Sequence, residues 1–245
     1  MNVFPDLTEN PASLQHGADG IPRWKRALDV TLILLALPFL LPLAVFIGVI
    51  IRIISPGPIL FRQERVGYLR RTFMCFKFRT MFLGAETSSH EGHLDHLMNS
   101  DTPMVKLDAR GDKRIIPLGS LLRASGLDEL PQLINVLRGE MSIVGPRPCL
   151  HYESSKYLPW QRERFNTLPG LTGLWQVRGK NKTTFTEMIQ LDIEYARTKS
   201  LAMDISILLK TIPAIVTQLL ESRRHPKPDA GVPVVRRRKF FEFGL

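Results

Sequence analysis

A long apolar stretch near the N-terminus constrains this chain more than any other feature of its sequence. Residues 27–54 are almost wholly apolar, and a helix of that length, at about 1.5 Å per residue, is long enough to cross the hydrocarbon core of a bilayer. A secretory signal explains it less well, because the apolar run is too long and no small-residue cleavage site follows it. We therefore expect this segment to lie in a membrane.

Charges on both sides of the stretch predict how it enters the membrane. Basic residues flank it before and after: Arg23, Lys25, Arg26, Arg52, Arg62, Arg65, Arg70 and Arg71. Because positive charge favours the cytoplasmic side, both flanks should lie in the cytosol. Pro38 and Pro42, near the middle, should break the helix and return it to the side from which it entered. We predict a re-entrant helical hairpin over residues 21–56.

A pair of adjacent carboxylates, Asp128 and Glu129, marks the most informative polar segment. Apolar residues recur after the pair at the spacing of one helix face, and Gly139 is a typical C-terminal stop. With Asp128 as the N-cap, Pro131 falls in the first turn, where its missing N–H would have had no partner. We predict a helix that starts at Asp128 and ends at Gly139, with both acids at the positive end of its dipole.

Arginines on either side of the acid pair could bind phosphate. Arg123 precedes it, and Arg147 follows within "GPRP", where Pro146 and Pro148 fix the backbone on both sides. A guanidinium on such a stiff loop is suited to bidentate phosphate binding. Each piece alone also has a simpler explanation, since acids commonly cap helices and "GPRP" is a typical turn.

The segment after the apolar stretch predicts a two-stranded hairpin. Residues 59–65 and 71–80 are rich in aromatic and branched types on either side of Gly67. Alternation along the second strand places Lys77 and Arg79 on one surface, where both cations could meet a diphosphate. A solvated basic face explains the same pattern equally well.

Three motifs in order give the chain a resemblance to a known family. They are "KFRTM" at 77–81, "LDELPQLINVLRGEMSIVGPRP" at 127–148 and "LPGLTGLWQVRGK" at 168–180. From residue 22 to residue 213 the chain resembles the monotopic bacterial sugar transferases, also called polyprenyl-phosphate phosphoglycosyl transferases. The resemblance implies transfer of a sugar 1-phosphate from a UDP-sugar to polyprenyl (undecaprenyl) phosphate with release of UMP, the first membrane step of exopolysaccharide or O-antigen synthesis.

The resemblance also implies roles for individual residues. Asp128 would be the nucleophile that forms an aspartyl-phosphosugar intermediate, and Glu129 would bind Mg²⁺. Four basic residues would stabilise charge: Arg123, Arg147, Lys77 and Arg79. Two prolines of "GPRP" and the segment after "LPGL" would bind substrate: Pro146, Pro148, Pro169, Gly170, Thr172, Gly173, Gln176 and Arg178. Trp175 and Arg178 differ from the residues usual in the family, so the sugar is left open.

Two more helices are predicted, at 184–198 and 201–220. The second is apolar enough for another span, but Asp204, Lys210 and Pro213 favour a packed or interfacial amphipathic helix. The chain is thus predicted to be mainly α with a small β-hairpin, as a monotopic membrane protein. It divides into four segments: a flexible arm at 1–20, the membrane helix at 21–56, a cytosolic, membrane-apposed catalytic domain at 57–220, and a basic and aromatic tail at 221–245.

The net charge and the cysteine content limit which partners and which cellular compartment are expected. Lys and Arg number 33 against 23 Asp and Glu, a net charge of +10, so the expected partners are polyanions. A phosphate-backbone binder has no use for carboxylates at its centre, which favours UDP-sugar, polyprenyl phosphate and anionic phospholipid over nucleic acid. Cys75 and Cys149 show no pairing pattern. This favours a reducing compartment, here the cytosolic face of the bacterial inner membrane.

Two alternative interpretations and the question of whether the chain forms a dimer stay open at this point. The chain could be a basic, membrane-anchored adaptor without catalysis, in which Asp128 and Glu129 only cap a helix. A metal site at His90, His93 and His96 is a weaker interpretation than a solvated polar loop, because three-residue spacing drifts around a helix. The sequence also leaves open whether the chain forms a homodimer.

Overall fold

The computed structural model describes residues 20–84, 88–104, 114–179 and 182–223. Within these ranges the chain is mainly helical with two small sheets, as predicted. The α-helices are α1 Arg23–Ile54, α2 Ser88–Met98, α3 Gly119–Ser125, α4 Leu133–Arg138, α5 His151–Ser155, α6 Leu174–Arg178, α7 Phe185–Thr198 and α8 Leu201–Arg223. The strands are β1 Leu60–Val66, β2 Thr72–Phe78, β3 Ser142–Val144 and β4 Gly170–Thr172, and three short 3-10 helices are η2 Tyr68–Arg70, η3 Leu127–Gln132 and η4 Trp160–Asn166.

Most of the predicted arm and tail lie outside the described ranges. The two C-terminal helices are confirmed as α7 and α8. The hydroxyl of Thr184 accepts a hydrogen bond from the backbone N–H of Glu187, so α7 begins with a capping box. The segment with the three histidines is helical in α2 rather than a loop. Among the described residues, no three His, Cys, Asp or Glu side chains come together as metal ligands.

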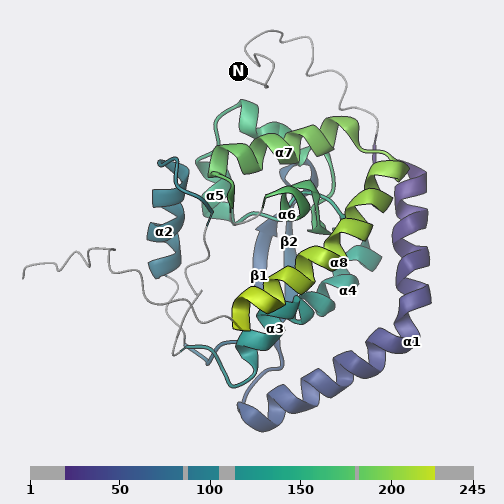
Figure 1. Ribbon diagram of the computed structural model, residues 1–245, viewed down its shortest axis with the longest axis vertical. Helices are drawn as coiled ribbons and strands as arrows, with labels where there is room; N and C mark the ends of the chain where they lie inside the picture. The colour runs from purple at the N-terminus through teal and green to yellow at the C-terminus, as the bar shows by residue number, and fades with distance from the viewer. Residues whose placement is uncertain (1–19, 85–87, 105–113, 180–181, 224–245) are drawn as a thin grey trace, which may run out of the picture.

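Helix α1 is bent near its middle, in the part that carries Pro38 and Pro42 (Figure 1). Its first arm runs down one side of the rest of the described chain, and its second arm passes beneath it (Figure 1). Each proline removes an intrahelical hydrogen bond, which explains the bend. The bend is compatible with the predicted re-entrant path, which itself stays a prediction. By length and composition alone, both α1 and residues Leu201–Leu220 of α8 could cross a membrane.

The second arm of α1 packs directly on β2 and α3. Ile47 and Ile51 are buried together with Phe78 of β2 and Leu122 of α3. Partly buried side chains complete this cluster: Leu43, Ala44, Ile59, Leu60, Leu127 and Leu130. Because Leu127 and Leu130 stand on either side of Asp128 and Glu129, the acid pair is anchored to the membrane helix by apolar packing.

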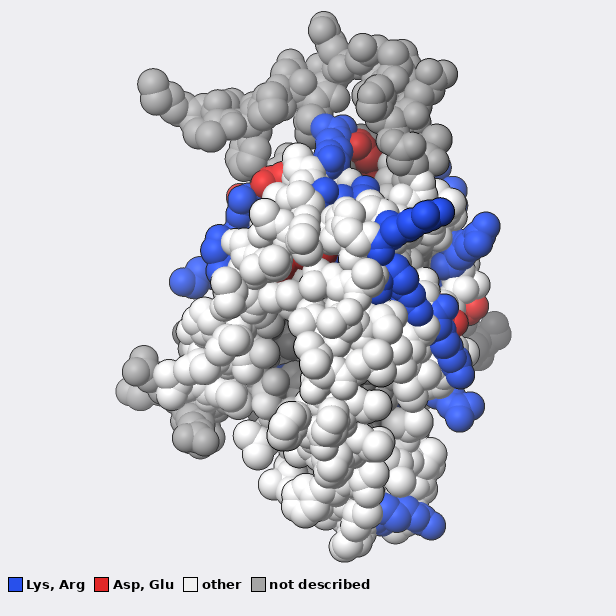
Figure 2. All heavy atoms as spheres, turned by 90° about the vertical axis from the view of Figure 1, so that its right-hand side faces the viewer, with Lys and Arg blue, Asp and Glu red and all other residues white. Residues whose placement is uncertain are grey.

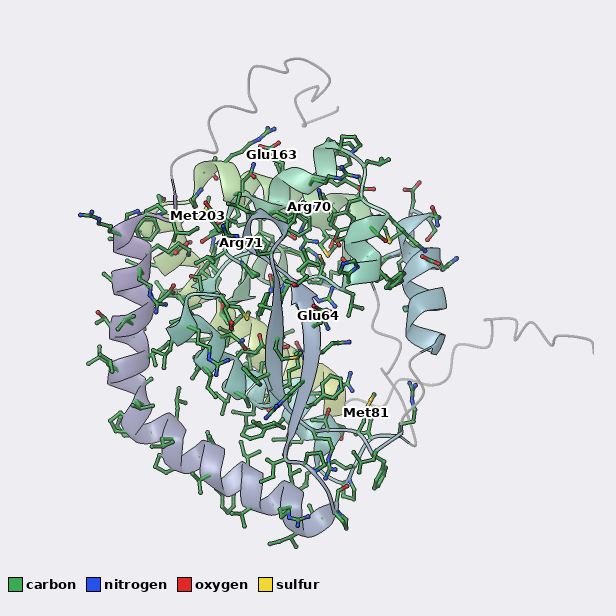
Figure 3. The ribbon with its side chains drawn as sticks, turned by 180° about the vertical axis from the view of Figure 1, so that it is seen from behind. Glu64, Arg70, Arg71, Met81, Glu163 and Met203 are labelled. Atoms are coloured by element: carbon green, nitrogen blue, oxygen red, sulfur yellow. The ribbon has the colours of Figure 1, made fainter. Side chains whose placement is uncertain are left out.

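The predicted hairpin is confirmed as the antiparallel pair β1 and β2, with Gln63 opposite Cys75 and Phe61 opposite Lys77. Figure 3 shows it from behind, with Arg70 and Arg71 at the connection between the strands and Met81 beyond the opposite end. The connection is η2 rather than a two-residue turn, and two of its residues have positive φ.

A second sheet was not predicted. Strands β3 and β4 pair in parallel, with Ser142 opposite Gly170 and Val144 opposite Thr172. Each strand has only three residues, which is too short for alternation to be visible in the sequence. This sheet places "GPRP", which follows β3, beside "PGLTG", which contains β4.

The predicted helix start at Asp128 is wrong. The chain enters the 3-10 helix η3 at Leu127, directly after Gly126, which has a φ of 73°. The backbone N–H of Glu129 donates to the carbonyl of Gly126 at 3.0 Å, a bond between residues three apart. Pro131 has no N–H and cannot bond back to Leu127, so the regular α-helix α4 begins only at Leu133. The predicted stop is confirmed, because Gly139 caps α4 with a φ of 78°.

Candidate active site

The acid pair lies where η3 packs against strand β2. Asp128 is buried, with 9% of its surface exposed. Glu129 is partly exposed and accepts a hydrogen bond from the ammonium of Lys77 at 2.7 Å. Lys77, which was predicted to bind phosphate, thus forms an ion pair with Glu129, which was predicted to bind the metal. The two acids differ in environment, since one is enclosed and the other faces a cation at the surface.

Four charged side chains act electrostatically on Cys75 of β2. Burial raises the pKa of its thiol, and the charges of Lys77, Arg65, Glu129 and Arg147 all act on it. Burial, with the neighbouring guanidinium of Arg147, also lowers the pKa of Arg65 to about 10. Desolvation is the larger cause of this lowering, and repulsion between the two guanidiniums adds to it. Glu129 and the arginine of "GPRP" thus both act on the same thiol, and their joint role in one substrate site stays a prediction.

Arg147 is held on one side and open on the other. Its side chain is 36% exposed, and its Nη1 lies 3.8 Å from Oε2 of the fully buried Glu153. Its carbonyl accepts a hydrogen bond from Nη2 of Arg164 at 2.8 Å. Arg164 also pairs with Asp192 at 2.6 Å. A buried ionic cluster therefore fixes the backbone of Arg147 and restrains its guanidinium, while part of that guanidinium stays accessible to a ligand.

The glycines of "PGLTG" are required by contact with "GPRP". A Cβ on Gly170 would lie 2.1 Å from the backbone nitrogen of Gly145, and one on Gly173 would lie 2.2 Å from the carbonyl oxygen of Gly145. The backbone nitrogen of Gly145 donates to the carbonyl of Thr172, and that of Gly170 to the carbonyl of Pro146, each at 2.8 Å. The sequence predicted that these glycines let the backbone approach a ligand closely. In the structure they let two segments of the chain approach each other closely. Substrate binding by this turn stays a prediction.

The other predicted site residues have varied surroundings. Arg79 is buried, and its guanidinium donates to the carbonyls of Ser55 and Pro56 at the end of α1. It therefore binds the end of α1 and does not accompany Lys77 on an open basic surface, which corrects that prediction. Arg178 forms an exposed ion pair with Glu194, at 2.8 Å.

Three further predicted residues pack close to α8 or the second sheet. The carbonyl of Arg123 accepts a hydrogen bond from Gln218 of α8, at 3.3 Å. The hydroxyl of Thr172 lies 2.8 Å from that of Thr211 on the same helix. The carbonyl of Pro169 accepts a hydrogen bond from the backbone N–H of Ser142, at 2.8 Å.

Buried charges around the "GPRP" loop were missed by the sequence analysis. They are Lys25, Asp29, Arg65, Glu153, Arg164, Asp192 and Asp204. For three of them a signal existed, because Lys25, Asp29 and Asp204 are ionisable residues on strongly apolar helices, where an ionisable side chain usually has a partner. The others stand in segments of mixed polarity, where nothing local distinguishes them from surface charges.

Comparison with known proteins identifies the family. The model of the bacterial sugar transferase family matches residues 21–218. The chain belongs to the bacterial sugar transferase family. The exopolysaccharide production protein ExoY of Sinorhizobium fredii is 37% identical over 191 residues, which are 78% of this chain and 84% of ExoY. The UDP-glucose:undecaprenyl-phosphate glucose-1-phosphate transferase of Caulobacter vibrioides is 40% identical over 201 residues, 79% of this chain and 70% of that relative.

A third relative shows how far the similarity extends. The galactosyl transferase CpsE of Streptococcus agalactiae is 38% identical over 193 residues, but these are only 42% of that protein. The similarity to each of the three relatives extends over 191 to 201 residues. As a member of this sugar transferase family the chain is an enzyme, so the alternative of an adaptor without catalysis is wrong.

Proposed function

We propose that this sugar transferase moves a sugar 1-phosphate from a UDP-sugar to polyprenyl phosphate, giving a polyprenyl-diphosphate-sugar and UMP. One observation carries the proposal: buried Asp128 stands beside Glu129, which pairs with Lys77 at 2.7 Å, and the flanking Leu127 and Leu130 pack on the second arm of α1. Such a site suits two phosphate substrates, one of them held in a bilayer. Two similar proteins, from Caulobacter vibrioides and Komagataeibacter xylinus, are named for transfer to undecaprenyl phosphate.

In the proposed first step an oxygen of Asp128 attacks the phosphorus that carries the sugar. The bond from that phosphorus to the bridging oxygen breaks, UMP leaves with the bridging oxygen, and an aspartyl-phosphosugar remains. In the second step an oxygen of polyprenyl phosphate attacks the same phosphorus and restores the carboxylate. Arg147 and Lys77 would bind the phosphate oxygens, whose negative charge would otherwise oppose the approach of Asp128.

The acid pair fits the ligand preference of Mg²⁺. Asp128 and Glu129 offer only oxygen donors, and Mg²⁺ commonly takes one or two carboxylates with substrate phosphates as its remaining ligands. Glu129 is the more exposed of the two, so we assign the ion to it. When bound, Mg²⁺ would neutralise diphosphate charge. Lys77 would then have to share Glu129 or turn to a phosphate.

The experiment that tests the reaction is an assay of membranes that contain the enzyme. With polyprenyl phosphate and a panel of UDP-glucose, UDP-galactose and N-acetylated UDP-sugars, we expect UMP release with at least one donor. A chelator should stop the release and added Mg²⁺ should restore it. Absence of UMP with every donor would contradict the reaction, whereas full turnover in excess chelator would contradict only the metal and the role of Glu129.

The proposed location is the cytosolic face of the bacterial inner membrane, with α1 as a re-entrant hairpin and α8 along the interface. Figure 2 shows Lys and Arg gathered over the upper part of the molecule and along one edge, while the lower part is almost free of charge. Exposed apolar side chains of α1 and α8 support contact with lipid: Leu34, Leu35, Phe39, Val45, Phe46, Ile53, Leu209, Ile212 and Val216. Contact of the basic edge with anionic phospholipid is part of the same proposal.

Labelling of single cysteines tests this topology. Cysteines placed in the first 20 residues and after residue 220 should both react with a membrane-impermeant reagent only after the cells are broken, because both basic flanks stay in the cytosol. Cys75 and Cys149 are buried and should give little background. Labelling of the N-terminal site in intact cells would contradict the re-entrant path. Pro42→Ala should turn some molecules into a straight span, with Pro38 limiting the effect.

A further inference from the structure

Three buried cations hold the loop that carries Arg147. Nζ of Lys25 donates to the carbonyl of Val144 at 2.8 Å, and Nη2 of Arg164 to the carbonyl of Arg147 at 2.8 Å. Nη1 of Arg65 donates to the carbonyl of Pro148 at 3.1 Å. These carbonyls belong to a short segment in which two residues are prolines, so the loop has few N–H groups with which to fix itself. Its shape therefore depends on cations supplied by other elements.

Lys25 differs from the other two because it lies in the first turn of the membrane helix. Its ammonium donates to three acceptors, namely the carbonyl of Val144, the hydroxyl of Tyr195 at 2.8 Å and a carboxylate oxygen of Asp204 at 2.7 Å. Lys25 and Asp204 are both fully buried. The Tyr195 hydroxyl in turn donates to the other oxygen of Asp204, at 2.7 Å. One side chain thus joins α1, β3, α7 and α8.

A second residue of α1 holds the same strand. One turn beyond Lys25, Oδ1 of Asp29 accepts hydrogen bonds from the hydroxyl of Ser142 at 3.0 Å and from the backbone N–H of Ile143 at 2.9 Å. Every residue of β3 is therefore bonded to the start of the membrane helix. Figure 3 shows Met203, the neighbour of Asp204, beside the first turns of α1. Strand β3 then leads directly into the loop with Arg147.

Stability alone does not call for this arrangement. Burying a lysine and an aspartate costs desolvation energy, and apolar residues of similar volume are often at least as stabilising in such a position. Apolar side chains would pack α1 against α8, but they could not bond to a particular carbonyl. What the ion pair adds is a fixed distance between the membrane helix and Val144, three residues before Arg147.

We propose that Lys25, paired with Asp204, is a positioning residue that couples the membrane helix to the loop of Arg147. Docking of α1 then sets where the guanidinium meets the substrate phosphates. This inference rests on the proposed function, because it assumes that Arg147 binds phosphate. A displacement of about 1 Å at such a group can lower turnover about 100-fold, so the coupling need not move the loop far to matter.

The decisive variant is the double substitution Lys25→Met with Asp204→Leu, which removes both buried charges and keeps apolar volume. Tyr195 still offers Val144 a donor, since its hydroxyl lies 3.1 Å from that carbonyl. We expect membrane insertion and a melting temperature close to those of the parent enzyme, with kcat for UMP release lowered about tenfold or more. Hydrogen exchange of residues 142–149 should become faster, without a general increase elsewhere.

The milder variant Tyr195→Phe covers the case in which the double variant does not fold. It removes one hydroxyl from the network and should lower kcat several-fold while the melting temperature stays within a few degrees. The matched control is Arg197→Gln with Glu163→Gln, an exposed ion pair of 2.5 Å between α7 and η4. Its loss should change neither kcat nor the exchange of residues 142–149.

A double-mutant cycle separates positioning from general support of the fold. If Lys25 acts through Arg147, the Lys25 and Asp204 substitutions should cost little further activity in an Arg147→Lys background. Fully additive losses, or parental kcat together with unchanged exchange in the folded variants, would overturn the inference. A parent enzyme that releases no UMP would instead contradict the proposed function, and the exchange measurement would still decide whether the helix holds the loop.

Discussion

Asp128→Asn is expected to abolish turnover, with a loss of at least about 10⁴-fold, because the amide cannot attack phosphorus. The substitution is nearly isosteric at a position with only 9% exposure, so the fold should persist. The parent enzyme, given UDP-sugar without lipid acceptor, should gain the mass of a sugar phosphate on the peptide that contains Asp128 and release an equal amount of UMP. The Asn variant should show neither.

The structure supports Asp128 rather than Glu129 as nucleophile for a reason that the sequence did not contain. Asp128 is buried within η3. Its short side chain has few conformations to lose when it is aligned with phosphorus. Glu129 is longer, partly exposed and already paired with Lys77. A carboxylate engaged in this way is better suited to hold a cation beside the diphosphate. Glu129→Gln should therefore weaken both steps, by about 10- to 100-fold, without removing the adduct.

Two outcomes would contradict the covalent mechanism. Either the Asp128→Asn variant still forms the adduct, or UMP appears only when both substrates are present. Direct transfer in a ternary complex would then replace the two displacements, and the kinetics would no longer be ping-pong. The surface variant Asp101→Asn serves as the control for replacing an acid, and it should leave adduct and turnover unchanged.

Sequence patterns correctly predicted the elements that are determined by a short stretch of the chain. The hairpin followed from two runs of aromatic and branched residues, and α7 from apolar residues that recur on one side of a helix. The prediction that a helix starts at Asp128 was wrong because of two residues that are visible in the sequence, Gly126 and Pro131. Gly126 stands alone between α3 and η3 with a positive φ, and Pro131 then prevents the first α-helical hydrogen bonds. Asp128 lies inside η3 and not before it, so it does not take the N-cap position that the sequence analysis assigned to it.

The parts of the site that escaped prediction depend on contacts between distant residues. Strands β3 and β4 are too short to have a period, and they pair across a separation of 28 positions, as between Ser142 and Gly170. Lys25 reaches Asp204 across 179 positions. The sequence marked both as charges on apolar helices, but nothing in it named them as partners. Similarly, Arg79 matched the pattern of Lys77, and only the tertiary structure turns it toward the end of α1.

Arg147→Lys is expected to lower kcat/KM about 100-fold, although it keeps the charge. The guanidinium can offer two parallel donors to a phosphate while its other edge faces Glu153, whose Oε2 lies 3.8 Å from Nη1. An ammonium is a single point charge and cannot serve both groups in this way. Because Glu153 is fully buried and lacks solvent, the new lysine should turn toward it and leave the substrate phosphates with one cation fewer.

The backbone of this loop makes the test specific for the side chain. Arg164 holds the carbonyl of residue 147, and the flanking Pro146 and Pro148 are unchanged, so the Lys variant should keep the loop conformation and the melting temperature. Arg162→Lys, at an exposed position within η4, is the matched control and should retain full activity. In Arg147→Ala, added guanidinium ions should restore part of the turnover and ammonium ions should not. An unimpaired Arg147→Lys enzyme would mean that "GPRP" only shapes the chain, and that the phosphates are held by Lys77 and the metal instead.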